Sequence, residues 1–156
     1  MKNSCSVSSR VLNYTSKTQK HKMPNWVMTT LTLTHSDDNM ISRVKNSITT
    51  GLFNEFVPIP TPEPEDLNRW CNDNWGTKWD AQDVRIAETD KNSITIVFNT
   101  AWSSPDIFYE KMEKLGFVVE ADWEEEGGEI GGSYRDGVAD IDEFEQDEDE
   151  DEDEDD

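Results

Sequence analysis

The sequence predicts an α+β domain of the ferredoxin-like kind, a split βαβ sandwich with the element order βαββαβ. Two patterns carry this prediction. Segments in which apolar and polar residues alternate, as they do in strands, are interleaved with segments in which apolar residues recur every three or four positions, as they do in helices. A third observation, the gathering of charge at both ends, limits the domain to residues 23–139. We expect a Pro/Trp-rich insertion at residues 53–82 and a short C-terminal hairpin.

The first strand and the first helix follow one another near the start of the domain. Val27, Leu31 and Leu33 alternate with a second face that is mostly threonine, which indicates a half-buried strand. Ser36 is the expected N-cap of the helix, and Gly51 is its stop signal. The buried stripe of this helix is expected to consist of Ile41, Val44 and Ile48.

The insertion is expected to begin with an extended connector. Residues 53–64 carry prolines at four alternate positions (58, 60, 62 and 64), a pattern that disfavours both helix and central strand. A short helix is expected next, with Pro64 in its first turn and Gly76 as a left-handed cap at its end.

The remaining elements complete the predicted sandwich. Residues 84–88 and 94–98 are expected to be two strands of a hairpin. A helix is expected from Ser104-Pro105-Asp106 to Gly116. The alternation along residues 117–124, the pair Gly127-Gly128 and a return strand through Ile130 and Tyr134 predict the terminal hairpin.

Charge divides the chain into three parts. Residues 1–22 contain five bases and no acid, residues 140–156 contain fourteen acids and no base, and the part between them holds 21 acids and 9 bases. We expect the two ends to be a disordered basic extension and a disordered acidic tail. An acidic domain repels phosphate, so direct nucleic-acid binding is not expected. The chain has two cysteines and no apolar run of membrane-spanning length, so we expect a cytoplasmic protein.

Four blocks follow one another along the domain: MPNW at 23–26, WCNDNWGTKWDA at 70–81, FNTAWSSP at 98–105 and EEEGGEIGGSYRDG at 124–137. Together they resemble the YubB ferredoxin-like domain family, whose members occur in bacteriophages and plasmids. The resemblance covers residues 23 to about 138, and it implies the fold and a mobile-element origin. It implies no activity and no catalytic residues. Members of the family tend to begin at the MPNW block, so the resemblance makes Met23 an alternative translation start.

Three tryptophans stand within ten positions in the stretch NRWCNDNWGTKWDA at 68–81. One interpretation is a lid on the core, because each indole buries about 150–250 Å². The other is a binding surface, in which aromatic faces surround a cation beside a carboxylate. Packing is the favoured interpretation. The candidate ligand or partner surface consists of Trp70, Trp75, Lys78, Trp79, Asp80 and Trp102.

One face of the predicted sheet is expected to be open. RNA recognition motifs carry base-stacking aromatic residues on this face. None of the corresponding positions here is aromatic or basic, so RNA binding by stacking is disfavoured. These positions are Thr30, Thr32 and Thr34 in the first strand and Ser93, Thr95, Val97 and Asn99 in the third.

The sequence shows no recognisable catalytic or metal-binding constellation. His21 lies in the basic extension, and His35 ends the first strand, where a lone histidine is usually solvated. Cys71 is expected to be a small buried residue, since only a contact with His35 in the fold could activate it. The glycine pairs near residue 130 lack the lysine and the helix start of a phosphate loop. We therefore predict a non-enzyme without cofactor or metal.

The predicted function is that of a phage or plasmid accessory protein, an acidic interaction module that binds a basic host protein. Some counter-defence proteins are acidic and mimic nucleic acid, and this analogy is one of class only. The tail is either the polyanion that attracts the basic partner or a solubilising segment. Its acidic run consists of Asp147, Glu148, Asp149, Glu150, Asp151, Glu152, Asp153, Glu154, Asp155 and Asp156.

The alternative function is a small-molecule or nucleotide-binding domain, extending to a weak hydrolase. It would use the tryptophan insertion together with Lys78, Asp80 and Asp83. The two functions map to different parts of the chain. Deleting residues 140–156 impairs the first and spares the second, whereas Trp79→Ala with retained folding does the opposite.

Overall fold

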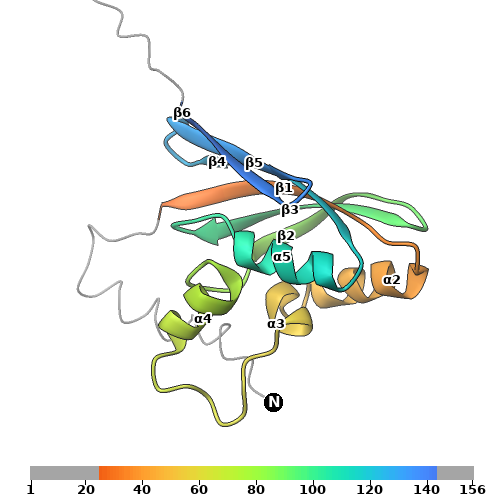
Figure 1. Ribbon diagram of the computed structural model, residues 1–156, viewed down its shortest axis with the longest axis horizontal. Coiled ribbons are helices and arrows are strands. Elements are labelled where there is room, and N and C mark those ends of the chain that lie inside the picture. Colours follow the sequence, from red (N-terminus) through yellow and green to blue (C-terminus); the bar gives the residue numbers. More distant parts are fainter. Residues whose placement is uncertain (1–24, 144–156) are drawn as a thin grey trace, which may run out of the picture.

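The computed structural model describes residues 25–143, which form an α+β domain with four helices and one six-stranded antiparallel sheet (Figure 1). The predicted α+β class is therefore confirmed. The strands are β1 (Trp26–Thr34), β2 (Gln82–Thr89), β3 (Ser93–Ala101), β4 (Val118–Glu125), β5 (Ile130–Arg135) and β6 (Val138–Glu143), in the sheet order β2-β3-β1-β4-β5-β6. The helices are α2 (Asp38–Ser47), α3 (Leu52–Phe56), α4 (Leu67–Trp75) and α5 (Asp106–Lys114).

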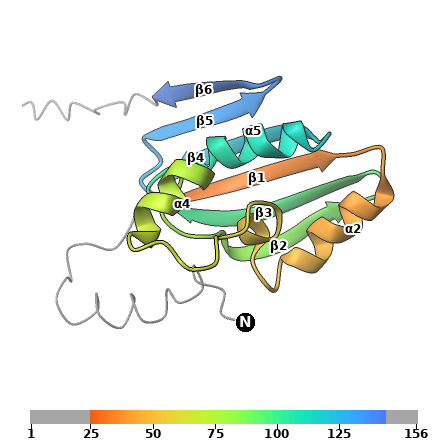
Figure 2. The same cartoon turned by 60° about the horizontal axis from the view of Figure 1, so that its bottom comes forward.

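All four helices of the described part lie against the same face of the sheet, and no other element of that part covers the opposite face, which we call the uncovered face (Figure 2). Alternation along β3 shows the two environments, because Ile94, Ile96 and Phe98 are buried beneath the helices. The side chains between them, Thr95 and Val97, are only partly buried. The largest fully buried side chains of the core are Trp75, Tyr109, Tyr134, Phe53, Phe98 and Phe108. No helix in this described part is long and apolar enough to cross a membrane.

Helix α2 begins one residue later than the sequence indicated. Asp37, not Ser36, is its N-cap, because the Asp37 carboxylate accepts the backbone N–H of Asn39 at 2.9 Å. Ile41 and Val44 are buried, in agreement with the predicted stripe. The helix ends at Ser47, before the expected glycine stop.

Helix α3 occupies the start of the segment that was predicted to be extended. That prediction was wrong for residues 53–56, because the prolines begin only at position 58 and two helical residues, Leu52 and Phe53, are fully buried. Gly51 precedes the helix with a φ of 135°, and a Cβ at this position would lie 2.9 Å from the Asp80 carboxylate.

Helix α4 begins at Leu67, so Pro64 does not lie in its first turn as predicted. Its N-cap is Asp66, whose carboxylate accepts the Arg69 N–H at 3.1 Å. The predicted left-handed cap at Gly76 is confirmed, with a φ of 85° and an N–H that donates to the Asn72 carbonyl at 3.0 Å.

The predicted hairpins are present as β2 with β3 and as β4 with β5, but β6 was not predicted. Residues 140–143 belong to β6, although the sequence indicated that they lie in a disordered tail. All six β6 residues are exposed, so burial imposes no apolar face that a sequence pattern could reveal. The basic extension at 1–22 and the acidic run at 147–156 lie outside the described residues.

Candidate functional site

Trp75 and Trp70 of helix α4 pack onto the core. Trp75 is fully buried, its Nε1–H donates to the Val57 carbonyl at 3.0 Å, and its ring centroid lies 5.7 Å from that of Phe53. The partly buried Trp70 meets Trp75 edge to face at 5.5 Å. These two predicted site residues therefore help to close the core, in agreement with the packing interpretation.

Trp79 belongs to a second aromatic group, at the start of β1. It is 7% exposed, and its ring centroid lies 6.1 Å from that of Trp26. The Lys78 ammonium lies 5.5 Å from the Trp79 ring centroid. The cation beside this indole is therefore supplied by the chain itself.

Asp80 serves as a remote cap for helix α3. Its Oδ1 accepts the N–H groups of Phe53 at 2.9 Å and Ala81 at 2.7 Å, and its Oδ2 accepts the Asn54 N–H at 3.1 Å. Burial raises the pKa of the Asp80 carboxyl to about 6, against these three backbone donors, which lower it. The structure thus places Asp80 in the scaffold and not in a ligand cage.

Trp102 is the accessible member of the predicted site. Its side chain is 48% exposed directly after β3, and its backbone has the left-handed φ of 72°. The Trp102 N–H donates to the Asn25 carbonyl at 2.9 Å. The predicted site residues therefore divide into a buried packing set and one exposed indole, and the described contacts do not bring them around one pocket.

His35 is only partly buried, and it has a structural role that the sequence did not indicate. Its Nε2–H donates to the Leu115 carbonyl at 2.9 Å, and its Nδ1 accepts the Asp37 N–H at 2.9 Å. Because both ring nitrogens bind backbone groups, neither is available to activate the buried Cys71. Residues 25–143 contain no group of three or more His, Cys, Asp or Glu side chains that could hold a metal ion.

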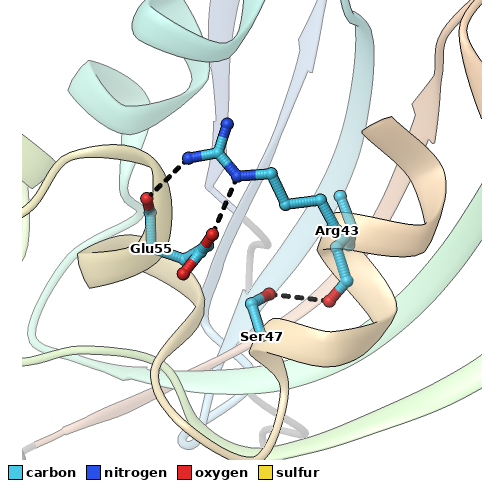
Figure 3. Close-up of polar contacts among 4 residues, drawn as sticks. Arg43, Ser47 and Glu55 are labelled. Carbon is cyan, nitrogen blue, oxygen red and sulfur yellow. Dashed lines mark hydrogen bonds and ion pairs between the residues drawn. The ribbon is translucent and has the colours of Figure 1, made fainter. Parts of the chain in front are cut away.

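A polar hollow of about 350 Å³ lies between helices α2 and α3. Arg43 donates from Nε to the Glu55 carboxylate at 2.8 Å and from Nη2 to the Glu55 carbonyl at 2.9 Å (Figure 3). Its guanidinium also lies 4.5 Å from the Phe56 ring centroid. Arg43 is thereby committed to joining the two helices. The hollow is lined by Asn39, Ser42, Arg43, Asn46, Ser47, Thr50 and Glu55.

The uncovered face of the sheet carries side chains in rows that follow from the strand register. A side chain and its Cα partner on an antiparallel neighbour point to the same side. Thr32 and Thr95 confirm this, since their hydroxyls lie 2.9 Å apart. One row runs Arg85, Val97, Thr30, Asp122, Ser133 and Asp140; the next runs Glu88, Thr95, Thr32, Glu120, Arg135 and Val138; a third contains Gln82, Asn99, Met28, Glu124, Gly131 and Asp142.

This face is acidic and carries exposed apolar side chains. Its six carboxylates are all exposed and face only two bases, Arg85 and Arg135. Three apolar side chains on the same face are strongly exposed: Met28 at 49%, Val118 at 57% and Val138 at 55%. The excess of charge of one sign on this face favours partners of the opposite charge. The carboxylates are Glu88, Glu120, Asp122, Glu124, Asp140 and Asp142.

A hollow of about 270 Å³ lies near the middle of this face. Met28 and Val97 supply apolar surface, and Asp122 and Glu124 supply carboxylates at one side. The hollow is completed by Thr29, Thr30 and Trp123. Apolar side chains next to carboxylates suit a side chain that has an aliphatic stem and a cationic head.

One of these two carboxylates, that of Asp122, already forms an ion pair with Arg135. Arg135 forms a bidentate pair with Asp122 at 2.9 and 2.8 Å, and these hydrogen bonds hold the pKa of the Asp122 carboxyl below its usual range. Within residues 25–143, neither Glu120 nor Glu124 forms an ion pair. The hollow thus has one neutralised carboxylate and one that is available to a partner.

The sequence showed which positions of the first and third strands lie on this face, but it did not show that the face is acidic. Thr30, Thr32 and Val97 lie where the alternation placed them. The alternation of Glu120, Asp122 and Glu124 with apolar residues was also visible, but their alignment beside β1 required the strand order.

A comparison of the chain with protein-family models, curated proteins and solved structures found no match.

Proposed function

We propose that the protein is a non-enzymatic interaction module and that the uncovered acidic face of its sheet binds a basic protein. The observation that carries this proposal is the hollow at Met28, Val97 and Glu124. It combines contact area for an aliphatic stem with a carboxylate for its cation. Lysine and arginine have this shape, so the partner presents one of them at the centre of the interface.

The surrounding charge supports the same partner class. The face has six carboxylates against two bases, and residues 25–143 are followed by further acids in the sequence. Such a field accelerates encounter with a basic protein and repels nucleic-acid backbones. The partner's other basic residues would meet Glu120, Asp140 and Asp142.

We further propose that the domain is a ferredoxin-like sandwich of the YubB kind, extended by β5 and β6. The order of its first four strands, β2-β3-β1-β4, supports this, as does the placement of all helices on one face. The sequence blocks that resemble the family support a role as a phage or plasmid accessory protein in the host cytoplasm.

The alternative, a small-molecule site in the tryptophan insertion, has less support. Trp75 is fully buried, Lys78 lies against Trp79, and Asp80 binds three backbone N–H groups. These residues are thus occupied in holding the fold together.

The test is a binding titration of the full chain with a fluorescein-labelled peptide of eight residues that alternates lysine with threonine and valine. We expect binding that weakens as salt rises from 50 to 300 mM, because the contacts are between exposed charges. Reversal of two face carboxylates, Glu120→Lys with Glu124→Lys, should weaken binding at least tenfold.

A matched control separates the face from the overall charge. Glu63 and Glu65 are exposed in the connector before α4, and Glu63→Lys with Glu65→Lys changes the net charge by the same amount. Its binding should remain within about threefold of the native protein, since a distant charge acts only through a screened field. Equal losses in both double variants, with thermal unfolding unchanged, would exclude the face as the binding site.

A further inference from the structure

We propose that β6 is a strand-addition site, at which an extended basic segment of the partner pairs with the edge of the sheet. This inference rests on the proposed function for the class of partner. It adds the mode of binding, which is backbone pairing along one strand.

The geometry of β6 is that of an open edge. It is the last strand of the described sheet, and within residues 25–143 it pairs only with β5. All six residues from Val138 to Glu143 are exposed, and none is proline. Their register with β5 is continuous, without a bulge. In an antiparallel edge strand every second residue directs its N–H and C=O away from its neighbour, so β6 offers a regular row of backbone donors and acceptors.

The opposite edge of the sheet is different. The pairing of β2 with β3 has two register shifts, between Gln82 and Arg85 and between Ile86 and Glu88. Asp83 within the first of them has a left-handed φ of 51°. Bulges of this kind disrupt a row of backbone groups and are a common protection of sheet edges. Of the two edges in the described sheet, β6 is therefore the one suited to strand addition.

The side chains of β6 select the kind of strand that can pair there. Asp140 and Asp142 lie on the uncovered face, and Ile141, which is 69% exposed, lies on the other. An added strand places its side chains about 5 Å from these. The fitting segment therefore alternates basic side chains, which face the two aspartates, with apolar ones, which contact Ile141.

The same charges disfavour pairing between two copies of the chain. A second β6 would bring Asp140, Asp142 and Glu143 against their own like charges across the new strand pair. The edge is also continuous with the acidic face, since Asp140 shares a row with Ser133 and Asp122. A basic strand at β6 thus extends the same contact surface as the central hollow.

The experiment uses the labelled lysine peptide, the full chain and two peptide analogues. Each analogue is N-methylated at one of the two sets of alternate residues, which removes the N–H groups along one edge of the peptide. At least one analogue should bind tenfold more weakly than the parent, because pairing requires the N–H groups of the edge that faces β6. If both analogues bind like the parent, strand addition is wrong.

A pair of protein variants tests the location. Asp142→Lys on β6 and Glu65→Lys in the connector before α4 reverse one exposed carboxylate each, the first at the proposed edge and the second away from the acidic face. We expect at least fivefold weaker peptide binding for the first and less than twofold for the second. Equal effects would remove β6 as the site, and so would a stable dimer of the full chain in sedimentation, because a second copy would then occupy the edge.

The two proposals fail in different ways. A parent peptide that does not bind the native protein contradicts the proposed function. A peptide that binds, and that responds to Glu120→Lys with Glu124→Lys but not to N-methylation or Asp142→Lys, contradicts strand addition alone.

Discussion

The carboxylate of Asp80 holds the N-terminus of helix α3 from 27 positions away, with its Oδ1 2.9 Å from the backbone nitrogen of Phe53. The residue at the N-cap position, Gly51, has no side chain that could make this bond. A five-residue helix is too short to be stable by itself. Its stability therefore depends on the burial of Leu52 and Phe53 and on the Asp80 contact.

Asp80→Ala should lower the free energy of unfolding by about 3 kcal/mol, because it leaves buried N–H groups without an acceptor. Urea unfolding followed by tryptophan fluorescence measures this. The matched control is Asp73→Ala, which removes an exposed carboxylate 3.8 Å from Arg69 and should cost less than about 0.5 kcal/mol. Similar losses in the two variants would contradict the role given to Asp80.

The same carboxyl should make stability depend on pH. Burial raises the pKa of Asp80 to about 6 in the folded state, above its usual value, so the folded protein binds this proton more tightly than the unfolded chain does. The resulting stabilisation is full below about pH 4 and is lost as the pH rises through 6. As the pH falls from 7 to 4, the free energy of unfolding of the native protein should therefore rise by up to about 3 kcal/mol relative to that of Asp80→Ala. A difference that stays constant across this range would contradict the raised pKa.

The elements that the sequence predicted well are those whose signals are local. The alternation along β1 and β3 and the glycine after α4 depend on neighbouring residues alone, and they appear in the structure where expected. Helix α3 was missed because its cap comes from Asp80, far along the chain. Strand β6 was missed although a local signal was present: Asp136 and Gly137, with left-handed φ values of 52° and 76°, form the two-residue turn that joins it to β5.

The candidate site shows the same division. The tryptophans of the insertion drew attention because of their number, but Trp75 and Trp79 are buried. The acidic hollow joins Met28 of β1, Val97 of β3 and Glu124 of β4. Each of these is unremarkable within its own strand, and only the strand order brings them together.

Gly132 should be required for β6 to pair with β5. A Cβ at this position would overlap the Asp140 carbonyl oxygen and would lie 2.7 Å from the Trp123 indole. Gly132→Ala should therefore lower stability by about 2 kcal/mol, as overpacking does. Gly127 is the control, because a Cβ there meets nothing within 4 Å. Gly127→Ala should change the urea midpoint very little, and equal midpoints for both variants would mean that β6 does not pack on β5 as described.

Deletion of residues 147–156 should change binding more than stability. The deletion removes ten carboxylates, whereas the core side chains of the described part lie between Val27 and Tyr134, so the melting temperature should remain nearly constant. Long-range fields accelerate encounter more than they slow dissociation. The association rate of the basic peptide should therefore fall, and the dissociation rate should remain nearly the same. The effect should fade at high salt, where charges separated by more than about 8 Å are screened. Stopped-flow measurements of both rates at two salt concentrations test this, and equal association rates at low salt would show that the acidic run takes no part in capturing the partner.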